Sequence, residues 1–202
     1  GWFYQRVYLS HRDAELPVVL VTEGYNRGRN YETELAKSIG ANQVIVEHRY
    51  YGESVPDSMD YRYLNIRQAT RDLHRIRTML GKLYPSPWVA SGISKGGQTT
   101  LYYRYFFPED VVASVPYVAP INLSLEDERI YAFLDEVGSG QCRRRIQAIQ
   151  RRILDEYDAS LLRLKWHAKG AEYQFGYLSL EEAFEYAVLE YPFSFWQWGA
   201  DC

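Results

Sequence analysis

The first 120 residues alternate between short apolar runs and amphipathic stretches. Five apolar segments predict strands, and two of them (17–21 and 44–46) are continuous enough for burial on both faces of a sheet: 5–10, 17–21, 44–46, 88–90 and 111–118. Apolar residues spaced by three and four predict helices between these strands: 31–39, 66–80 and a stretch after residue 94 that ends at residue 107. Asn65 is predicted to cap the second helix and Gly81 to end it. Alternating strands and helices form a parallel sheet with right-handed crossovers, the α/β class.

The pattern changes after Pro120, where no further strand is predicted. Three helical stretches follow instead: 124–137, 143–165 and 179–191. The sequence therefore predicts two parts, an α/β core over residues 1–121 and an all-helical part over residues 122–202.

Composition and charge narrow the class of protein. Apolar residues make up 47% of the 202 residues and charged residues 24%, which is typical of a globular chain. The 23 basic and 26 acidic residues give a net charge of -3, so no basic field favours nucleic acid. No run approaches the roughly 20 apolar residues that span a bilayer, so we expect no membrane segment.

The strongest chemical signal is Gly92-Ile93-Ser94-Lys95-Gly96, which matches Gly-x-Ser-x-Gly. This pattern places a serine on a sharp strand-to-helix turn, where glycines avoid Cβ clashes and the hydroxyl is exposed. The preceding apolar strand and the following helix supply that context, so Ser94 is the predicted nucleophile, with Gly92 and Gly96 as the elbow glycines. The alternative is a glycine-rich turn without chemistry.

A serine nucleophile needs two donors for the oxyanion. We expect the backbone N–H of Lys95, which opens the following helix, to be one donor. The second is expected from the loop after the first buried strand, where we select the N–H of Tyr25. The alternative for that loop is an ordinary turn at a strand end.

The sequence lacks a convincing general base. In this arrangement an acid and then a histidine follow the serine along the chain. The histidines before Ser94 are His11, His48 and His74, and we interpret His48 as a packed residue. His167 follows the serine but lies near the end of a helix, where the dipole favours a surface histidine. We therefore expect the base and its carboxylate outside these residues, and the fragment alone to be inactive.

Three acidic residues fall at or just after strand ends, the side on which α/β sheets bind ligands: Glu23, Glu47 and Glu53. Glu23 and Glu47 are candidates for holding a substrate amino group, with a structural role as the alternative for each. The sequence has no Walker A loop or dinucleotide fingerprint, and Cys142 and Cys202 are too few for a zinc ribbon. We expect no cofactor and no metal. The two cysteines are either unrelated thiols or one disulfide.

Several segments resemble the secreted bacterial prolyl tri/tetrapeptidyl aminopeptidase family, which is related to the lysosomal prolyl carboxypeptidase family. The segments that carry the resemblance are 3–7, 46–54, 92–97, 106–110, 115–120 and 191–198. The resemblance implies an α/β-hydrolase fold with an inserted helical cap (residues 122–202), without the C-terminal strands. It also implies a secreted or periplasmic serine peptidase that releases short peptides from free N-termini.

In that family the nucleophile corresponds to Ser94, and the acid and histidine lie beyond the cap. A missing C-terminal portion of the same protein is therefore an expected partner, along with peptide substrates. An exported protein resides in an oxidising compartment, where disulfides persist. The resemblance therefore favours a Cys142–Cys202 disulfide that brackets most of the cap. Two alternatives stay open: an esterase or lipase of the same fold, and a non-catalytic hydrolase-like domain that binds peptides.

Overall fold

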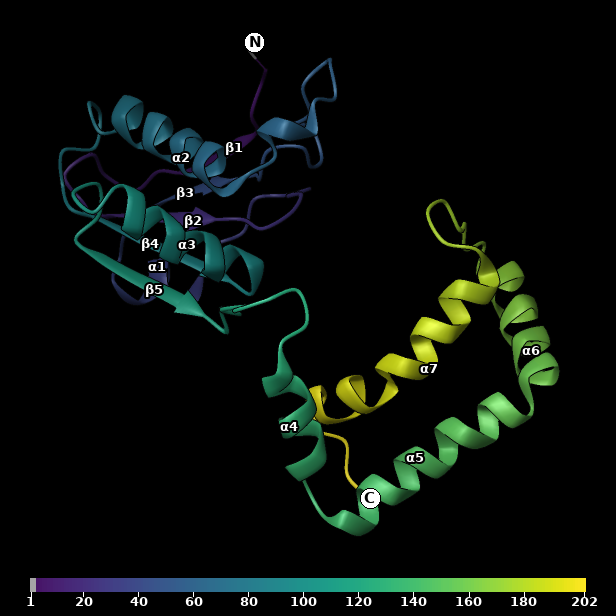
Figure 1. Ribbon diagram of the computed structural model, residues 1–202. Helices are drawn as coiled ribbons and strands as arrows, with labels where there is room; N and C mark the ends of the chain where they lie inside the picture. The colour runs from purple at the N-terminus through teal and green to yellow at the C-terminus, as the bar shows by residue number, and fades with distance from the viewer. Residues whose placement is uncertain (1–2) are drawn as a thin grey trace. The chain divides into compact units, whose positions relative to one another are not determined.

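A computed structural model describes residues 3–202, which divide into two compact units (Figure 1). The first unit ends at Ile121 and the second runs from Asn122 to Cys202. We describe each unit by itself.

The first unit is built on a five-stranded sheet. Its strands are β1 (Val7–Ser10), β2 (Val18–Thr22), β3 (Asn42–Val46), β4 (Trp88–Ile93) and β5 (Ala113–Tyr117). They lie in the order β1-β3-β2-β4-β5, and β2 to β5 run parallel to one another. Only the edge strand β1 is antiparallel, with Val7 opposite Val46 of β3. The expected α/β class is confirmed, and all five predicted strands form.

Helices cover both faces of this sheet. They are α1 (Glu34–Ser38), α2 (Ile66–Leu80) and α3 (Lys95–Phe106), with a short 3₁₀ turn over Tyr61–Tyr63. Asn65 caps α2 as predicted, because its side chain accepts the Gln68 N–H at 3.0 Å. The first helix is shorter than predicted, since Thr33 caps it through a hydrogen bond from Ala36 N–H.

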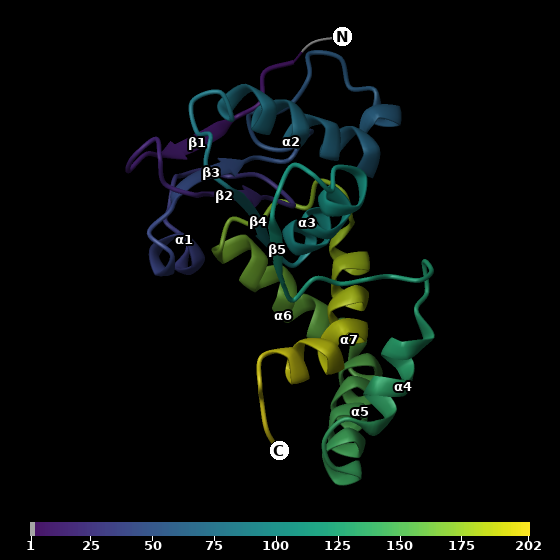
Figure 2. The same ribbon diagram turned by 90° about the vertical axis from the view of Figure 1, so that its left-hand side faces the viewer.

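The strand side chains alternate between two apolar layers, as a sheet buried on both faces requires. Leu20 and Val44 pack with α2 and α3, whereas Val21 and Ile45 pack with α1. Helices α1 and α2 lie on opposite sides of the strands (Figure 2). Trp88 and Tyr103 are the largest fully buried side chains among residues 3–202. This sandwich fixes the carboxyl ends of β2, β3 and β4 side by side.

The second unit is all-helical. Its helices are α4 (Glu128–Glu136), α5 (Gly140–Asp155), α6 (Tyr157–Gly170) and α7 (Leu180–Gln197). The prediction of one helix over 143–165 was wrong, because Glu156 leaves the helical conformation (ψ 33°) and separates α5 from α6. The apolar spacing continues across this single residue, so the sequence pattern did not reveal the break. The prediction that the last helix ends before Pro192 was also wrong, since α7 continues to Gln197.

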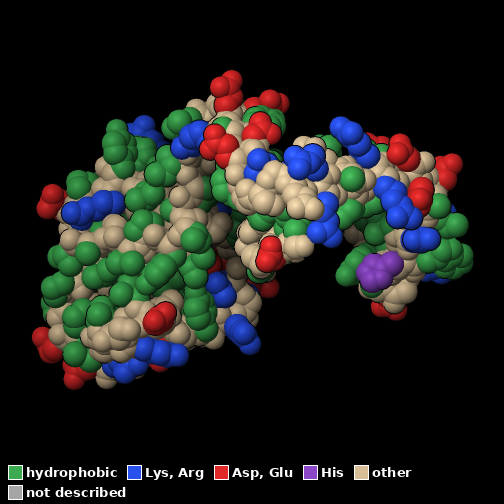
Figure 3. All heavy atoms as spheres, turned by 90° about the horizontal axis from the view of Figure 1, so that it is seen from below, with side chains coloured by type: hydrophobic (Ala, Val, Ile, Leu, Met, Phe, Trp, Pro, Cys, Tyr) green, Lys and Arg blue, Asp and Glu red, His purple; other side chains and the backbone are tan. Residues whose placement is uncertain are grey.

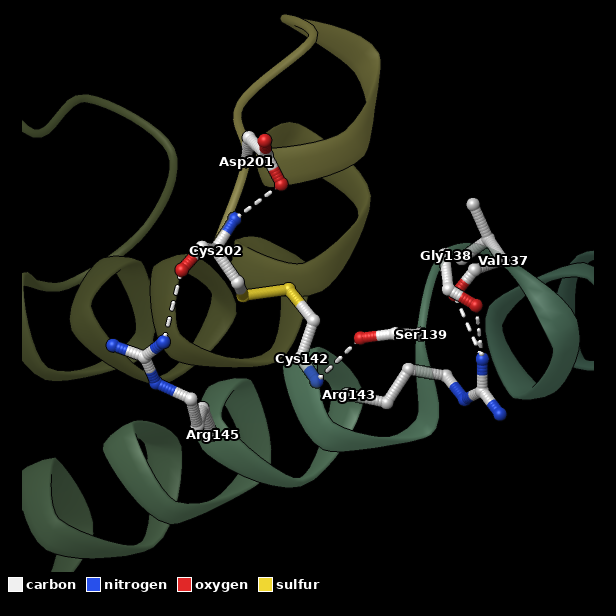
Figure 4. The surroundings of a disulfide bond; sticks show 8 residues. All are labelled: Val137, Gly138, Ser139, Cys142, Arg143, Arg145, Asp201 and Cys202. Carbon is white, nitrogen blue, oxygen red and sulfur yellow. Dashed lines mark hydrogen bonds between the residues drawn. A yellow bond between two sulfur atoms is a disulfide. The ribbon is translucent and has the colours of Figure 1, made fainter.

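Cys142 and Cys202 form a disulfide that joins the start of α5 to the C-terminal residue of the chain (Figure 4). The Cα atoms are 5.5 Å apart. The Ser139 hydroxyl caps α5 by accepting the Cys142 N–H at 3.1 Å, and Arg145 Nη1 donates to the Cys202 carbonyl at 3.0 Å. These contacts fasten the segment after α7 to α5.

On the face drawn in Figure 3, Lys and Arg side chains are interspersed with Asp and Glu side chains. Among residues 3–202, no helix is both long and apolar enough to cross a membrane. The same residues contain no cluster of three or more His, Cys, Asp or Glu side chains arranged to hold a metal ion.

Candidate active site

Ser94 occupies a strained turn between β4 and α3. Its backbone has φ 55° and ψ -120°, a conformation that non-glycine residues rarely adopt and that clusters at functional sites. The Ser94 N–H donates to the Tyr117 carbonyl at 2.9 Å, which ties the turn to the end of β5. The serine is exposed and its hydroxyl does not cap α3. The hydroxyl is therefore presented at the amino end of a helix, as a nucleophile elbow requires.

The glycines around Ser94 allow three backbone segments to approach closely. A Cβ at Gly92 would lie 2.4 Å from the Gly96 carbonyl oxygen. A Cβ at Gly96 would lie 2.4 Å from the Thr22 carbonyl oxygen. Both positions therefore exclude larger residues, because each Cβ would strike backbone that has no room to move.

A pair of buried hydroxyl groups binds the backbone of the elbow. Thr22 Oγ1 lies 2.7 Å from the Gly96 carbonyl oxygen and 2.7 Å from Thr100 Oγ1. Both threonines are buried. These bonds satisfy a carbonyl in the first turn of α3 and link β2 to that helix. Reasoning from the sequence did not identify Thr22 or Thr100, because threonine in a strand or helix is too common to serve as a signal.

The loop after β2 packs directly on the elbow. A Cβ at Gly24 would lie 2.6 Å from Lys95 Cβ and 2.8 Å from Gly96 N. The loop is held from the other side by the His48 N–H, which donates to the Tyr25 carbonyl at 3.1 Å. Within residues 3–202, neither the Tyr25 N–H nor the Lys95 N–H donates a hydrogen bond to another group of the chain. Two N–H donors beside the serine are what an oxyanion hole needs.

The amino edge of the parallel strands, opposite to Ser94, carries two of the histidines. His74 on α2 binds Asp110 at 2.7 Å, and Asp110 precedes β5. His11 follows β1, whose last residue Ser10 pairs with Gln43 near the start of β3. Ser94 follows the carboxyl end of β4, so neither histidine is placed to take its proton.

His48 is the one histidine of the first unit at the same sheet edge as Ser94, because it follows β3. It is nearly buried, and its Nδ1 lies 2.9 Å from the Arg49 carbonyl oxygen rather than beside a carboxylate. Burial lowers the pKa of His48 to about 4. A histidine with this pKa is a weak base at neutral pH. These contacts fit a packed residue.

The carboxylate of Glu47 is held by its own chain. It is fully buried at the end of β3 and accepts four hydrogen bonds from its own chain. Oε1 accepts from the Arg27 N–H, and Oε2 accepts from the N–H groups of Glu53 and Ser54 and from Ser54 Oγ. These bonds favour the structural role for Glu47, and its contact with a substrate amine stays a prediction.

Glu23 lies at the end of β2, close in sequence to the loop that packs on the elbow. Its Oε1 accepts from Arg27 Nε at 2.8 Å. Burial raises the pKa of Glu23, and Arg27 opposes that shift. Contact between Glu23 and a substrate amine stays a prediction.

A cavity of about 170 Å³ lies beside the elbow, within the first unit. Its lining includes Lys95 and Thr99 from α3 and His48 and Tyr51 from the segment after β3. The lining is mostly apolar, so this hollow suits an uncharged group of a substrate.

An exposed serine at φ 55° between a parallel strand and a helix, with the loop after β2 packed against that turn, is the arrangement of a nucleophile elbow in the α/β-hydrolase class. The fold is also similar to the crystal structure of proline iminopeptidase from Mycobacterium smegmatis, with TM-score 0.52 and 17% identity over 92% of this chain and 64% of that chain.

The chain belongs to the peptidase S37 family, since the family model described as PS-10 peptidase S37 matches residues 1–202. It is 36% identical over 207 residues to the prolyl tri/tetrapeptidyl aminopeptidase of Streptomyces mobaraensis. The matched region covers all of this chain and 43% of that relative. It is also 34% identical over 99 residues to the lysosomal Pro-X carboxypeptidase of Mus musculus. That matched region covers 44% of this chain and 20% of the relative. The resemblance noted from the sequence is confirmed. The chain spans less than half the length of these relatives.

Proposed function

We propose that this chain carries the nucleophile of a serine exopeptidase that releases short peptides from free N-termini. The observation that carries the proposal is the exposed Ser94 at φ 55°. The Tyr25 and Lys95 N–H groups, which donate no hydrogen bond within residues 3–202, are the proposed oxyanion donors. Membership of the peptidase S37 family and the name of the Streptomyces relative support peptide bonds as the target.

In the proposed reaction, Ser94 Oγ attacks the carbonyl carbon of the scissile peptide bond and loses its proton to a general base. The Tyr25 and Lys95 N–H groups hold the negative oxygen of the tetrahedral intermediate. The base then protonates the leaving amine, and the N-terminal peptide stays on Ser94 as an ester. The base then removes a proton from water, which attacks the ester carbonyl. Proton return to Ser94 Oγ releases the short peptide.

The base and its orienting carboxylate are proposed to lie outside these 202 residues. The surroundings of His11, His48 and His74 support this, because none of the three is both beside Ser94 and oriented by a carboxylate. The matched relatives are also more than twice as long as this chain. An exported location, which the family resemblance implies, belongs to the same proposal.

The test uses a protein that carries these 202 residues together with the proposed histidine-bearing segment. We expect it to release tri- or tetrapeptides from substrates with a free amino terminus and to spare the N-acetylated substrates and acyl esters of matched length. Ser94→Ala should abolish release. Equal turnover of N-acetylated peptides would contradict the exopeptidase assignment, and preference for esters would favour an esterase of the same fold.

A further inference from the structure

The side chain of Lys95 makes a contact that its expected backbone role does not explain. Its ammonium Nζ donates a hydrogen bond to the Gly24 carbonyl at 2.6 Å. That carbonyl and the Tyr25 N–H belong to the same peptide group. In a trans peptide they point in opposite directions, so a donor fixed on the oxygen sets the direction of the N–H.

We propose that Lys95 is a positioning residue for the oxyanion hole, because its ammonium holds the Gly24–Tyr25 peptide so that the Tyr25 N–H faces the substrate carbonyl. This inference rests on the proposed function. The ammonium and the backbone N–H of Lys95 then both serve the oxyanion hole, since the N–H is itself the other proposed oxyanion donor.

The packing around the loop supports this arrangement. Gly24 lies against the Lys95 stem so closely that an added Cβ would be 2.9 Å from Lys95 Cγ. The next carbonyl along the chain, that of Tyr25, accepts the His48 N–H at 3.1 Å. The carbonyls on both sides of Tyr25 are therefore held, one by the side chain of Lys95 on α3 and one by the backbone that follows β3.

The charge of Lys95 adds to its hydrogen bond. Nζ lies 5.2 Å from the centre of the Tyr25 ring and 5.3 Å from that of Tyr51, within the range of cation–π attraction. The two rings meet edge to face, with centres 5.5 Å apart. A cation at the carbonyl end of a peptide polarises it and strengthens its N–H as a donor. The rings also keep the ammonium in place.

Burial lowers the pKa of Lys95 from its ordinary value, because the half-buried site disfavours the charged form. Acylation of Ser94 should therefore fall as the pH rises through this lowered pKa. The other titratable groups at Nζ are the phenols of Tyr25 and Tyr51 and the imidazole of His48, which is already neutral there because its pKa is lowered to about 4.

The experiment measures the acylation rate of Ser94 by a fluorophosphonate against pH, in the protein that carries the proposed histidine-bearing segment. This reagent has no titratable amine, so an alkaline loss of rate cannot come from the substrate. We expect Lys95→Met to lower the rate about 10- to 100-fold, below the roughly 100- to 1,000-fold of a deleted oxyanion donor, and to remove the alkaline loss. With peptide substrates, kcat should fall and KM should change little.

Lys95→Arg keeps the cation and does not deprotonate in the accessible range, so its alkaline loss should move upward or vanish. Lys82→Met changes an exposed lysine after α2 and should leave rate and pH profile unchanged. Tyr51→Phe retains the ring without the phenol and should keep the alkaline loss.

A Lys95→Met rate within about twofold of the parent, or an alkaline loss that is the same in Lys95→Arg, would overturn the inference. If Lys95→Met does not fold, the profile of Lys95→Arg decides. Failure of the proposed function gives a different result, since turnover would then persist in Ser94→Ala. If Ser94→Ala abolishes turnover but the Lys95 variants keep the acylation rate and pH profile of the parent, the positioning role alone is rejected.

Discussion

Replacing Glu47 tests whether its carboxylate serves the fold rather than a substrate. Four donors meet its two oxygens at 2.7–3.0 Å, and the side chain is fully buried. In Glu47→Gln the amide oxygen can replace Oε2, which leaves the amide NH₂ facing the Arg27 N–H. One charge-assisted hydrogen bond is lost, one donor loses its acceptor, and the other three bonds become neutral.

Such bonds to a charged group contribute about 1.5–3 kcal/mol each, and a buried unsatisfied donor costs about 1–3 kcal/mol. We therefore expect Glu47→Gln to lower the free energy of unfolding by about 3 kcal/mol. Glu47→Ala leaves all four donors without an acceptor and should lower it by about 4–5 kcal/mol, at the upper end for single substitutions.

The assay is urea unfolding, with the free energy taken from the midpoint and slope. Glu53→Gln is the matched control, because that side chain is 70% exposed and forms a surface ion pair with Arg6 at 3.3 Å. It should change stability by less than about 0.5 kcal/mol. A Glu47→Gln protein as stable as the parent, with a raised KM for substrates with free amino termini, would refute the structural role and restore the amine-binding interpretation.

Two further predictions concern stability. Cys142→Ser should destabilise the second unit by about 4 kcal/mol in the chain-entropy estimate, because the disulfide closes a loop with a sequence separation of 60; unchanged urea unfolding of this unit would refute that contribution. His48 is held neutral with a pKa lowered to about 4 from 6.5, so the unfolded chain takes up its proton first as the pH falls. Stability should therefore fall by roughly 3 kcal/mol between pH 7 and pH 3 on account of this group, and His48→Phe should flatten that part of the profile; an identical profile in the variant would count against it.

Much of the first unit was predictable because its strands are continuous apolar runs between turn residues. The Gly-x-Ser-x-Gly pattern located Ser94 for a related reason, since few residues tolerate φ 55° or the contacts at Gly92. Local rules of backbone geometry leave a visible trace in sequence.

Features that depend on distant contacts were harder to predict. The role of Glu47 follows from donors 6 to 20 residues away, which meet only when the chain folds. The bond from Lys95 Nζ to Gly24 joins residues separated by 71 positions. The break at Glu156 depends on a single backbone angle, so the apolar spacing of the helices gave no warning.

The most direct test of the central claim is the site of covalent modification by a fluorophosphonate, mapped by mass spectrometry. The protein should carry these residues together with the proposed histidine-bearing segment and should be active before treatment. The account predicts one adduct on Ser94, loss of activity in proportion to labelling, and no adduct in Ser94→Ala. An active protein that is inhibited through another residue, or that keeps its activity after Ser94 is fully modified, would contradict it.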